Sequence, residues 1–459
     1  MNRLFIDNSI GEIIEKYVRK ELAPRDVAAD ALQNIAELDP LYFAWVSAAD
    51  AKWPERVQNE AEIFGINEKN LLEYIPVGIK DIYNTRDFPT QMGSPLWKDF
   101  TPGNDARAVY YLKRAGAIVA GKTVTAEFAV HALDKTLNPY DTSKTPGTSS
   151  SGSAVAVSLG IVPLATGSQT AGSIVRPASF CGIYGMKPSF GLIPRTGTLK
   201  TTDSLDTLGF FVLHAEDLRR GFDALRVRGE NYPISHAALS DVVRQQKTAK
   251  QPWRVALVKT HTWKHAPDYA KEALLGFVKK LTAVGMDVTE TELPEAMAHT
   301  HKVHETIYNK SLSYYFAKEY TKTEFVSPIM NELIASGNAI APEQFAKALA
   351  DQNELIYAMD DFFKNFDILI SLSTAGEAPP REVTELPDPA LMWTLAHLPV
   401  VSAPVFASPG GLPFGMQVAA RKYNDCLLLS FIEELRAKSL IPSVAGFCTK
   451  KRDLDNHCI

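Results

Sequence analysis

Three short segments of the chain carry residue types that could carry out chemistry together. Lys80 stands in a short apolar run, where burial would disfavour the ammonium form, lower the lysine pKa and allow the amine to act as a general base. The serine run Ser149–Ser151 and the dipeptide Gly172-Ser173 supply hydroxyls that such a base could turn into nucleophiles. The alternative is a structural Lys80 at a strand end that reaches water or pairs with Asp81.

Both serine segments lie within residues 145–175, a stretch of 31 residues without a charge. Ser, Thr and Gly are frequent there and Pro163 interrupts it, whereas a membrane-spanning helix needs ~20 mostly apolar residues. Buried hydroxyls need hydrogen-bond partners. We therefore expect a small-residue helix over 153–159, packed at the centre of the protein, with chemistry in the loops that flank it.

Other motifs around these serines are incomplete. Gly147 and Gly152 have the glycine spacing of a P-loop, but Ser153 stands where that loop needs lysine. No serine lies in a G-x-S-x-G elbow or is followed three residues later by lysine, so the α/β-hydrolase and penicillin-binding patterns lack support.

We predict no metal site and no organic cofactor. Three histidines lie close in sequence, but only the last two share a helix face and no carboxylate or cysteine completes a ligand set: His299, His301 and His304. A solvated helix face is the prediction, with one histidine at a substrate entrance as the alternative. The four cysteines match neither a disulfide scaffold nor a zinc knuckle: Cys181, Cys426, Cys448 and Cys458.

The composition is that of an ordinary globular protein. The 459 residues are 46% hydrophobic and 22% charged, with a net charge of −5, which gives no global attraction to nucleic acid or to an anionic membrane. Acidic residues precede any long apolar run at the amino terminus, so we expect no signal peptide and a cytoplasmic location.

The order of the elements favours an α/β fold. Strand–helix–strand patterns are expected over 74–120 and 253–291, since alternating elements of this kind build a sheet with helices on its faces. Further helices are expected at 9–38, 296–318, 343–364 and 424–438, further strands at 367–372 and 415–420, and a surface loop at 374–390. With no repeat and no linker, one large domain over residues 1–459 is predicted.

Several motifs in a fixed order make the chain similar to the amidase signature family. They are VGIKD at 77–81, GKTVTAEF at 121–128, GTSSSGSAVAV from 147, TGSQTAGSIVRPASFCGIYGMKP up to 188, SLDTLGF at 204–210, WTLAHLPVVSAP at 393–404 and GLPFGMQVAARKYND at 411–425. The resemblance implies a single α/β domain with a mixed β-sheet core flanked by helices, and a core signature segment of about 74–210.

The resemblance also implies a Ser–cis-Ser–Lys triad. Lys80 matches the family lysine, Ser173 the nucleophile, and Ser149, 24 residues before it, the bridging serine. In the family the peptide bond before the bridging serine is cis, and here that bond is Thr148–Ser149. The expected oxyanion hole consists of the backbone N–H groups of Thr170, Ala171, Gly172 and Ser173.

Three positions depart from the family pattern. Thr148 replaces the usual glycine, and Gln169 replaces a supporting aspartate, so the contacts that support the nucleophile must differ. Arg176 lies three residues after the nucleophile instead of two. We interpret it as a structural ion-pair or hydrogen-bond residue.

The activity that the resemblance implies is hydrolysis of a small-molecule carboxylic amide. Phe128, Ala129 and Val130 are the expected substrate contacts, which would suit an aryl or alkyl acyl group; the alternative is that Phe128 belongs to the core. Two other functions stay open: the amidase subunit of a tRNA-dependent amidotransferase, and an inactive relative that serves as a binding module. A homodimer is also left open.

Overall fold

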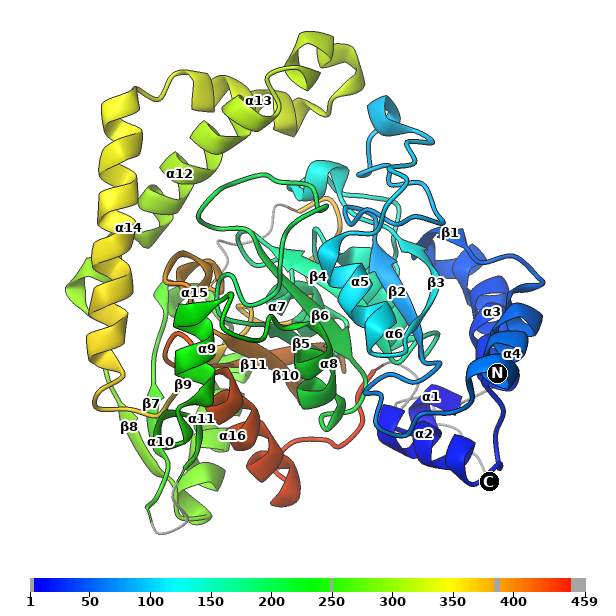
Figure 1. The fold of residues 1–459 in the computed structure, drawn as a ribbon. Helices are drawn as coiled ribbons and strands as arrows, with labels where there is room; N and C mark the ends of the chain where they lie inside the picture. The colour runs from blue at the N-terminus through cyan, green and yellow to red at the C-terminus, as the bar shows by residue number, and fades with distance from the viewer. Residues whose placement is uncertain (1–3, 248–250, 384–388, 447–459) are drawn as a thin grey trace.

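One mixed sheet of eleven strands runs through the molecule (Figure 1). The computed structural model describes residues 4–247, 251–383 and 389–446. Its strands lie in the order β1-β3-β2-β4-β6-β5-β10-β11-β9-β7-β8. The sheet contains parallel pairs such as β2/β3 and β7/β9 and antiparallel pairs such as β4/β6, so the prediction of an α/β fold around a mixed sheet is confirmed.

The strands are β1 (Trp45–Ala48), β2 (Pro76–Lys80), β3 (Ile118–Thr123), β4 (Leu164–Gln169), β5 (Tyr184–Lys187), β6 (Thr207–Val212), β7 (Arg254–Leu257), β8 (Asp287–Glu290), β9 (Ile368–Leu372), β10 (Val400–Ala407) and β11 (Pro413–Ala419). The helices are α1 (Leu4–Asp7), α2 (Ile10–Val18), α3 (Pro24–Tyr42), α4 (Trp53–Phe64), α5 (Arg107–Arg114), α6 (Ser151–Ser158), α7 (Val175–Phe180), α8 (Asp217–Leu225), α9 (Pro233–Ser240), α10 (Val242–Gln245), α11 (Asp268–Ala283), α12 (Thr300–Tyr315), α13 (Pro328–Asn338), α14 (Pro342–Phe362), α15 (Leu391–Leu395) and α16 (Asp425–Ala437). Short 3₁₀ helices cover Pro95–Trp97, Glu127–Ala129, His261–His265, Glu295–His299 and Glu319–Phe325.

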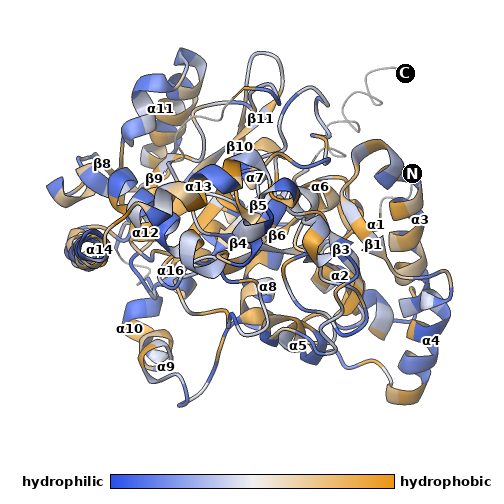
Figure 2. Ribbon diagram, turned by 90° about the horizontal axis from the view of Figure 1, so that it is seen from above, coloured by the Kyte–Doolittle hydropathy of each residue, from blue (hydrophilic) through white to orange (hydrophobic). Residues whose placement is uncertain are grey.

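The charge-free segment forms the centre of the molecule, as predicted. Every residue of α6 and of β4 is buried, because their small side chains let the backbone pack closely on its neighbours. Seen from above, α6 and α7 lie on one side of the central strands, and α5 and α8 lie on the other (Figure 2). The loops at both ends of α6 and β4 therefore meet inside the protein.

Helices α12, α13 and α14 form a separate layer beside the sheet (Figure 1). Helix α12 packs on α13, α14 and α15. Their apolar side chains share a core cluster with Phe128, Val175 and Trp393. The layer thus rests on the segments that surround the predicted nucleophile.

Strand β10 escaped prediction because Pro404 interrupts its apolar run. Proline cannot donate to a sheet ladder and is tolerated at bulges. The β10–β11 register shifts between Ala403 and Phe406, which accommodates the proline.

Part of the sequence expectations falls outside the described residues. Cys448, Cys458 and part of the loop 374–390 lie there, while Cys181 and Cys426 are free thiols. Within the described ranges, no helix is long and apolar enough to cross a membrane.

Candidate active site

Lys80 is the last residue of β2, and its side chain is completely buried. Its Nζ lies 2.8 Å from the Oγ of Ser149, 2.9 Å from that of Ser150 and 2.8 Å from that of Ser168. Burial lowers the pKa of Lys80 well below its usual value, although Asp134 and Asp206 act in the opposite direction.

A neutral Lys80 amine has two N–H bonds and one lone pair, so one of its three hydroxyl neighbours must donate a proton to it. The Ser150 hydroxyl donates instead to the carbonyl of Ser168, at 3.2 Å. This leaves Ser149 or Ser168 as the donor. The geometry therefore allows Ser149 to pass a proton to Lys80.

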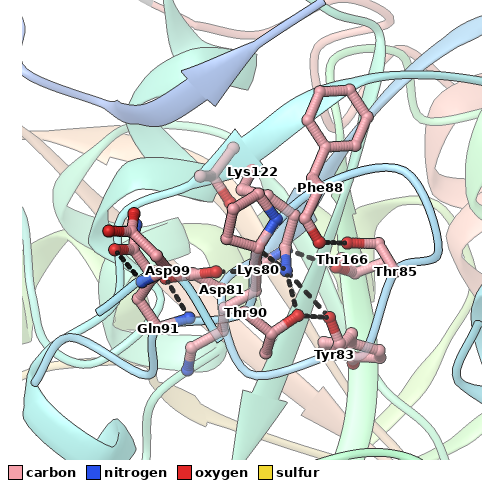
Figure 3. Close-up of polar contacts among 12 residues, drawn as sticks. Lys80, Asp81, Tyr83, Thr85, Phe88, Thr90, Gln91, Asp99, Lys122 and Thr166 are labelled. Atoms are coloured by element: carbon pink, nitrogen blue, oxygen red, sulfur yellow. Dashed lines mark hydrogen bonds and ion pairs between the residues drawn. The ribbon is translucent and has the colours of Figure 1, made fainter. Parts of the chain in front are cut away.

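The structural alternative for Lys80 is wrong, because Asp81 pairs with a different lysine (Figure 3). The Asp81 carboxylate lies 3.1 Å from Nζ of Lys122, and both side chains are fully buried. Lys122 also donates to the carbonyl of Tyr83 at 2.9 Å and to the hydroxyl of Thr90 at 2.8 Å. Lys80 itself has no exposed surface, so it does not reach water.

The loop that holds Ser149 packs directly against the nucleophile helix α7. The Thr148–Ser149 peptide bond, whose conformation the sequence left open, is cis, as in the family pattern. Gly147 has a φ of +83°, and a Cβ built on it would stand 2.9 Å from the backbone of Pro177, so only glycine fits there. Arg176 donates from Nη2 to the carbonyl of Thr148 at 2.8 Å, which supports its interpretation as a structural residue.

Ser173 lies in the turn between β4 and α7, and 5% of its surface is exposed. Among the described residues its hydroxyl makes no hydrogen bond, and none joins it to Ser149. The structure thus brings Lys80 and Ser149 into contact and leaves the Ser173 hydroxyl unengaged by protein groups.

The backbone around Ser173 presents a row of N–H groups with no protein acceptor. Within the described part of the chain, this holds for the N–H groups of Ala171, Gly172 and Ser173. The carbonyl of Gly172, in contrast, accepts from the N–H of Arg176 at 2.9 Å. Free N–H groups beside a nucleophile are what an oxyanion hole requires.

Gln169, at the position where the family pattern has an aspartate, holds the turn that carries Ser173. Its Oε1 accepts from the N–H of Ile174 at 2.9 Å and of Val175 at 3.0 Å. Its Nε2 donates to Oγ1 of Thr394 at 2.9 Å. An aspartate could accept the two N–H groups but could not donate the third bond, so the support differs from the family pattern, as predicted.

Asp206 belongs to the SLDTLGF motif, but the sequence assigned no role to it. Its carboxylate accepts from the N–H groups of Thr201 and Thr202, at 2.8 and 3.0 Å. It also accepts from the hydroxyl of Thr170 at 2.9 Å. The sequence did contain a signal for this contact, because Asp206 follows the two consecutive threonines Thr201 and Thr202. Short polar side chains can satisfy a buried carboxylate through local hydrogen bonds.

Two cavities reach this region. The larger holds about 820 Å³, and its walls include Thr148, Ala171, Arg176, His131 and Tyr308. The smaller holds about 220 Å³, and its walls include Ser168, Thr170 and Ala129. The larger cavity is the candidate substrate site, because it is lined by Thr148, next to the serine run, and by Ala171, the first of the residues with a free N–H group.

The expected substrate contacts fall beside this cavity and not in it. Phe128 is fully buried, and its ring packs 4.8 Å from that of Phe316, which favours the core alternative. Val130 is also buried, and Ala129 lines the smaller cavity. The next residue, His131, lines the larger cavity; the sequence did not reveal it, because the expected contacts were apolar side chains.

The prediction that the three histidines lie on a solvated helix face is wrong for His304. Its side chain is buried, and its Nε2 lies 2.8 Å from the carbonyl oxygen of Thr170. Burial lowers the pKa of His304 to about 4. His301 and His304 both line the larger cavity, which agrees with the substrate-entrance alternative, and no group of metal-ligating side chains occurs among the described residues.

Comparisons with known proteins agree with this geometry. A glutamyl-tRNA(Gln) amidotransferase subunit of Nostoc sp. is 29% identical, over 92% of this chain and 96% of the relative. The corresponding subunit of Listeria innocua is 28% identical, over 92% and 95%.

Three solved structures share the fold. A chain of a vestigial protein complex, described as revealing the evolutionary origins of an s-triazine catabolic enzyme, superposes with a TM-score of 0.83 at 25% identity, over 94% of this chain and 99% of that chain. The glutamyl-tRNA(Gln) amidotransferase subunit of Thermotoga maritima gives 0.73 at 25% identity, over 92% and 93%. The peptide amidase of Stenotrophomonas maltophilia gives 0.79 at 23% identity, over 96% and 99%.

The sequence profile of the family called Amidase matches residues 26–429. This range contains every residue of the site described above. The chain therefore belongs to the amidase signature family, the hydrolases of carboxylic amide C–N bonds.

Proposed function

We propose that the protein hydrolyses a small-molecule carboxylic amide through a covalent acyl-enzyme on Ser173. The observation that carries the proposal is a fully buried Lys80, with a lowered pKa, in contact with Ser149. A lowered pKa favours the neutral amine, which is the form that accepts protons. It gives the serine loop the base that a hydroxyl nucleophile needs.

In the first half-reaction the Ser173 oxygen attacks the amide carbon. Its proton passes to Ser149, whose own proton passes to Lys80. The carbonyl oxygen becomes an oxyanion and accepts hydrogen bonds from the N–H groups of Ala171, Gly172 and Ser173. The backbone N–H group of Thr170, which the family resemblance also assigns to the oxyanion hole, remains part of this proposal.

The first half-reaction ends when the C–N bond breaks as Lys80, through Ser149, returns a proton to the leaving nitrogen, and ammonia or an amine departs. In the second half-reaction a water molecule gives a proton to the relay and attacks the acyl-enzyme, which frees the acid and restores Ser173. We propose that these steps need no cofactor.

Replacement of the nucleophile tests the proposal. Ser173→Ala should abolish amide turnover and labelling by a fluorophosphonate while the far-ultraviolet circular dichroism stays unchanged. Ser240→Ala, at the exposed end of α9, is the matched control. Undiminished turnover in Ser173→Ala would contradict the assignment of the nucleophile.

The amidotransferase alternative is supported by the names of the two relatives from Nostoc sp. and Listeria innocua. Full turnover of simple amides by the purified chain alone supports a free-standing hydrolase. Co-purification with partner chains, joined to transfer activity, would support the amidotransferase role. The presence of Lys80, Ser149 and Ser173 speaks against an inactive relative.

Several sequence expectations stay predictions. They are the single domain over residues 1–459 with a signature segment of about 74–210, the cytoplasmic location, the homodimer and the lack of nucleic-acid and membrane partners. Size-exclusion chromatography with light scattering checks the homodimer.

A further inference from the structure

The backbone that carries the free N–H groups is held at its carbonyl oxygens by side chains from distant helices. A peptide group is planar, and its C=O points opposite to the N–H of the next residue. Fixing the carbonyls of Thr170, Ala171 and Gly172 therefore fixes the N–H directions of Ala171, Gly172 and Ser173. Each of these three carbonyls accepts a hydrogen bond in the structure.

Two of the three donors are side chains. His304 of α12 meets the Thr170 carbonyl at 2.8 Å, which makes its Nε2 the protonated nitrogen. Thr394 of α15 donates to the Ala171 carbonyl at 2.7 Å. We propose that His304, Thr394 and Gln169 are positioning residues that aim the N–H groups of the oxyanion hole. This inference rests on the proposed function and adds residues to it.

Gln169 is included among the positioning residues because it determines the direction in which the Thr394 hydroxyl donates its proton. Its Oε1 is committed to the N–H groups of Ile174 and Val175, so its amide nitrogen must be the end that faces Thr394. That nitrogen donates to Oγ1 of Thr394. A hydroxyl has one proton, and the Ala171 carbonyl at 2.7 Å receives it in preference to the Ala390 carbonyl at 3.4 Å.

Gln169→Glu reverses this direction without changing the size of the side chain. One carboxylate oxygen still accepts the two N–H groups at the start of α7, which favour the ionised form. The other oxygen cannot donate, and it accepts the Thr394 proton instead. The Ala171 carbonyl then loses its donor, and the Gly172 N–H loses its fixed direction.

His304 and Thr394 allow variants that separate the hydrogen bond from packing. Thr394→Val keeps the shape and removes the proton, whereas Thr394→Ser restores the proton. His304→Phe keeps a ring and removes the donor, whereas His304→Gln keeps a donor at the position of Nε2. Thr282→Val is the control, since Thr282 is an exposed helical threonine that also donates to a backbone carbonyl.

The experiment measures the rate at which a fluorophosphonate labels Ser173 and the affinity for phenylboronic acid, because both adducts place an oxygen in the oxyanion hole. Removing one N–H donor of an oxyanion hole lowers the rate by about 10²–10³-fold. A donor that is present but points in the wrong direction should have a smaller effect. We therefore expect labelling to slow by about tenfold or more in Gln169→Glu, Thr394→Val and His304→Phe. Boronate affinity should fall in parallel. Thr394→Ser and His304→Gln should recover much of both, and circular dichroism should show that every variant is folded at the assay temperature.

The double variant Gln169→Glu/Thr394→Val sharpens the test. Both changes remove the same bond to Ala171, so the double variant should label no more slowly than the slower single variant. Labelling within about twofold of wild type in all three disruptive variants, or fully additive losses, would overturn the proposal. A wild-type protein that is not labelled at Ser173 would contradict the proposed function as well, which distinguishes the two failures.

Discussion

Two buried lysines stand side by side on neighbouring strands and have opposite surroundings. Lys80 ends β2, and Lys122 lies on β3, in register with Ile79. Nζ of Lys122 faces the carboxylate of Asp81 at 3.1 Å, whereas Nζ of Lys80 meets only serine hydroxyls. Both side chains have no exposed surface.

The surroundings determine the charge of each lysine. Burial lowers the pKa of Lys122 to about 8, and Asp81 limits the shift. Burial also lowers the pKa of Lys80, well below its usual value, and the acidic neighbours of Lys80 offer only longer-range attraction. A carboxylate partner thus makes a buried lysine structural, and hydroxyl partners leave it free to accept a proton.

The largest expected effect is on activity. Lys80→Met keeps the stem of the side chain but removes the basic nitrogen, so turnover should fall by about 10³-fold or more, because the nucleophile depends on this base. Its melting temperature should fall less than that of Lys122→Met, because Lys80→Met leaves neutral hydroxyls without a partner, whereas Lys122→Met leaves a buried carboxylate without one. Steady-state kinetics on the best amide substrate measures the loss; an active Lys80→Met would leave Ser149 without its base.

Lys122→Met should show the opposite pattern. Removing one member of a buried ion pair leaves Asp81 unpaired and costs about 3–5 kcal/mol in the free energy of unfolding. Urea denaturation measures the loss, and burst labelling of Ser173 counts the molecules that remain folded. Turnover per labelled molecule should stay close to wild type; a stable Lys122→Met with poor turnover would place Lys122 in the chemistry.

The sequence was sufficient for what depends on local pattern. The strand before Lys80, the buried small-residue helix α6 and the order of the motifs all follow from residues adjacent in the chain. The partner of Asp81 does not, because Lys122 is 41 residues away and its approach depends on the pairing of β2 with β3.

The contacts of His304 and Thr394 were beyond prediction for the same reason. They meet the nucleophile turn from α12 and α15, 134 and 223 residues distant from their acceptors. When apolar and polar residues are mixed around a helical histidine, the sequence does not show whether that face of the helix packs inward. Packing of the helical layer on the sheet decides it.

The pH profile is the third way to separate the two lysines. The active form carries a neutral Lys80, so kcat should fall as the pH drops through the lowered pKa of Lys80, by about tenfold per pH unit below it. The pKa of Lys122 is also lowered in the folded protein, so above about pH 8 the unfolded chain binds more protons than the folded one, and the melting temperature should rise as the pH increases beyond that value. Both dependences are tested by measuring kcat and the melting temperature in the same series of buffers. If kcat and the melting temperature changed over the same pH range, unfolding alone would limit the rate.

The smallest expected effect comes from the long-range charge near Lys80. Asp134 raises the pKa of Lys80 against the effect of burial, and burial raises the pKa of Asp134 itself. Asp134→Asn keeps an acceptor for the Ser151 hydroxyl but removes the negative charge, so the pKa of Lys80 should fall further. The acid limb of the kcat profile should then move to lower pH by a fraction of a unit, above the pH at which Asp134 ionises. The control is Glu343→Gln, an exposed change at the start of α14, which should leave the acid limb of the kcat profile in place. A shift of the acid limb to higher pH in Asp134→Asn would contradict the assignment of that limb to Lys80.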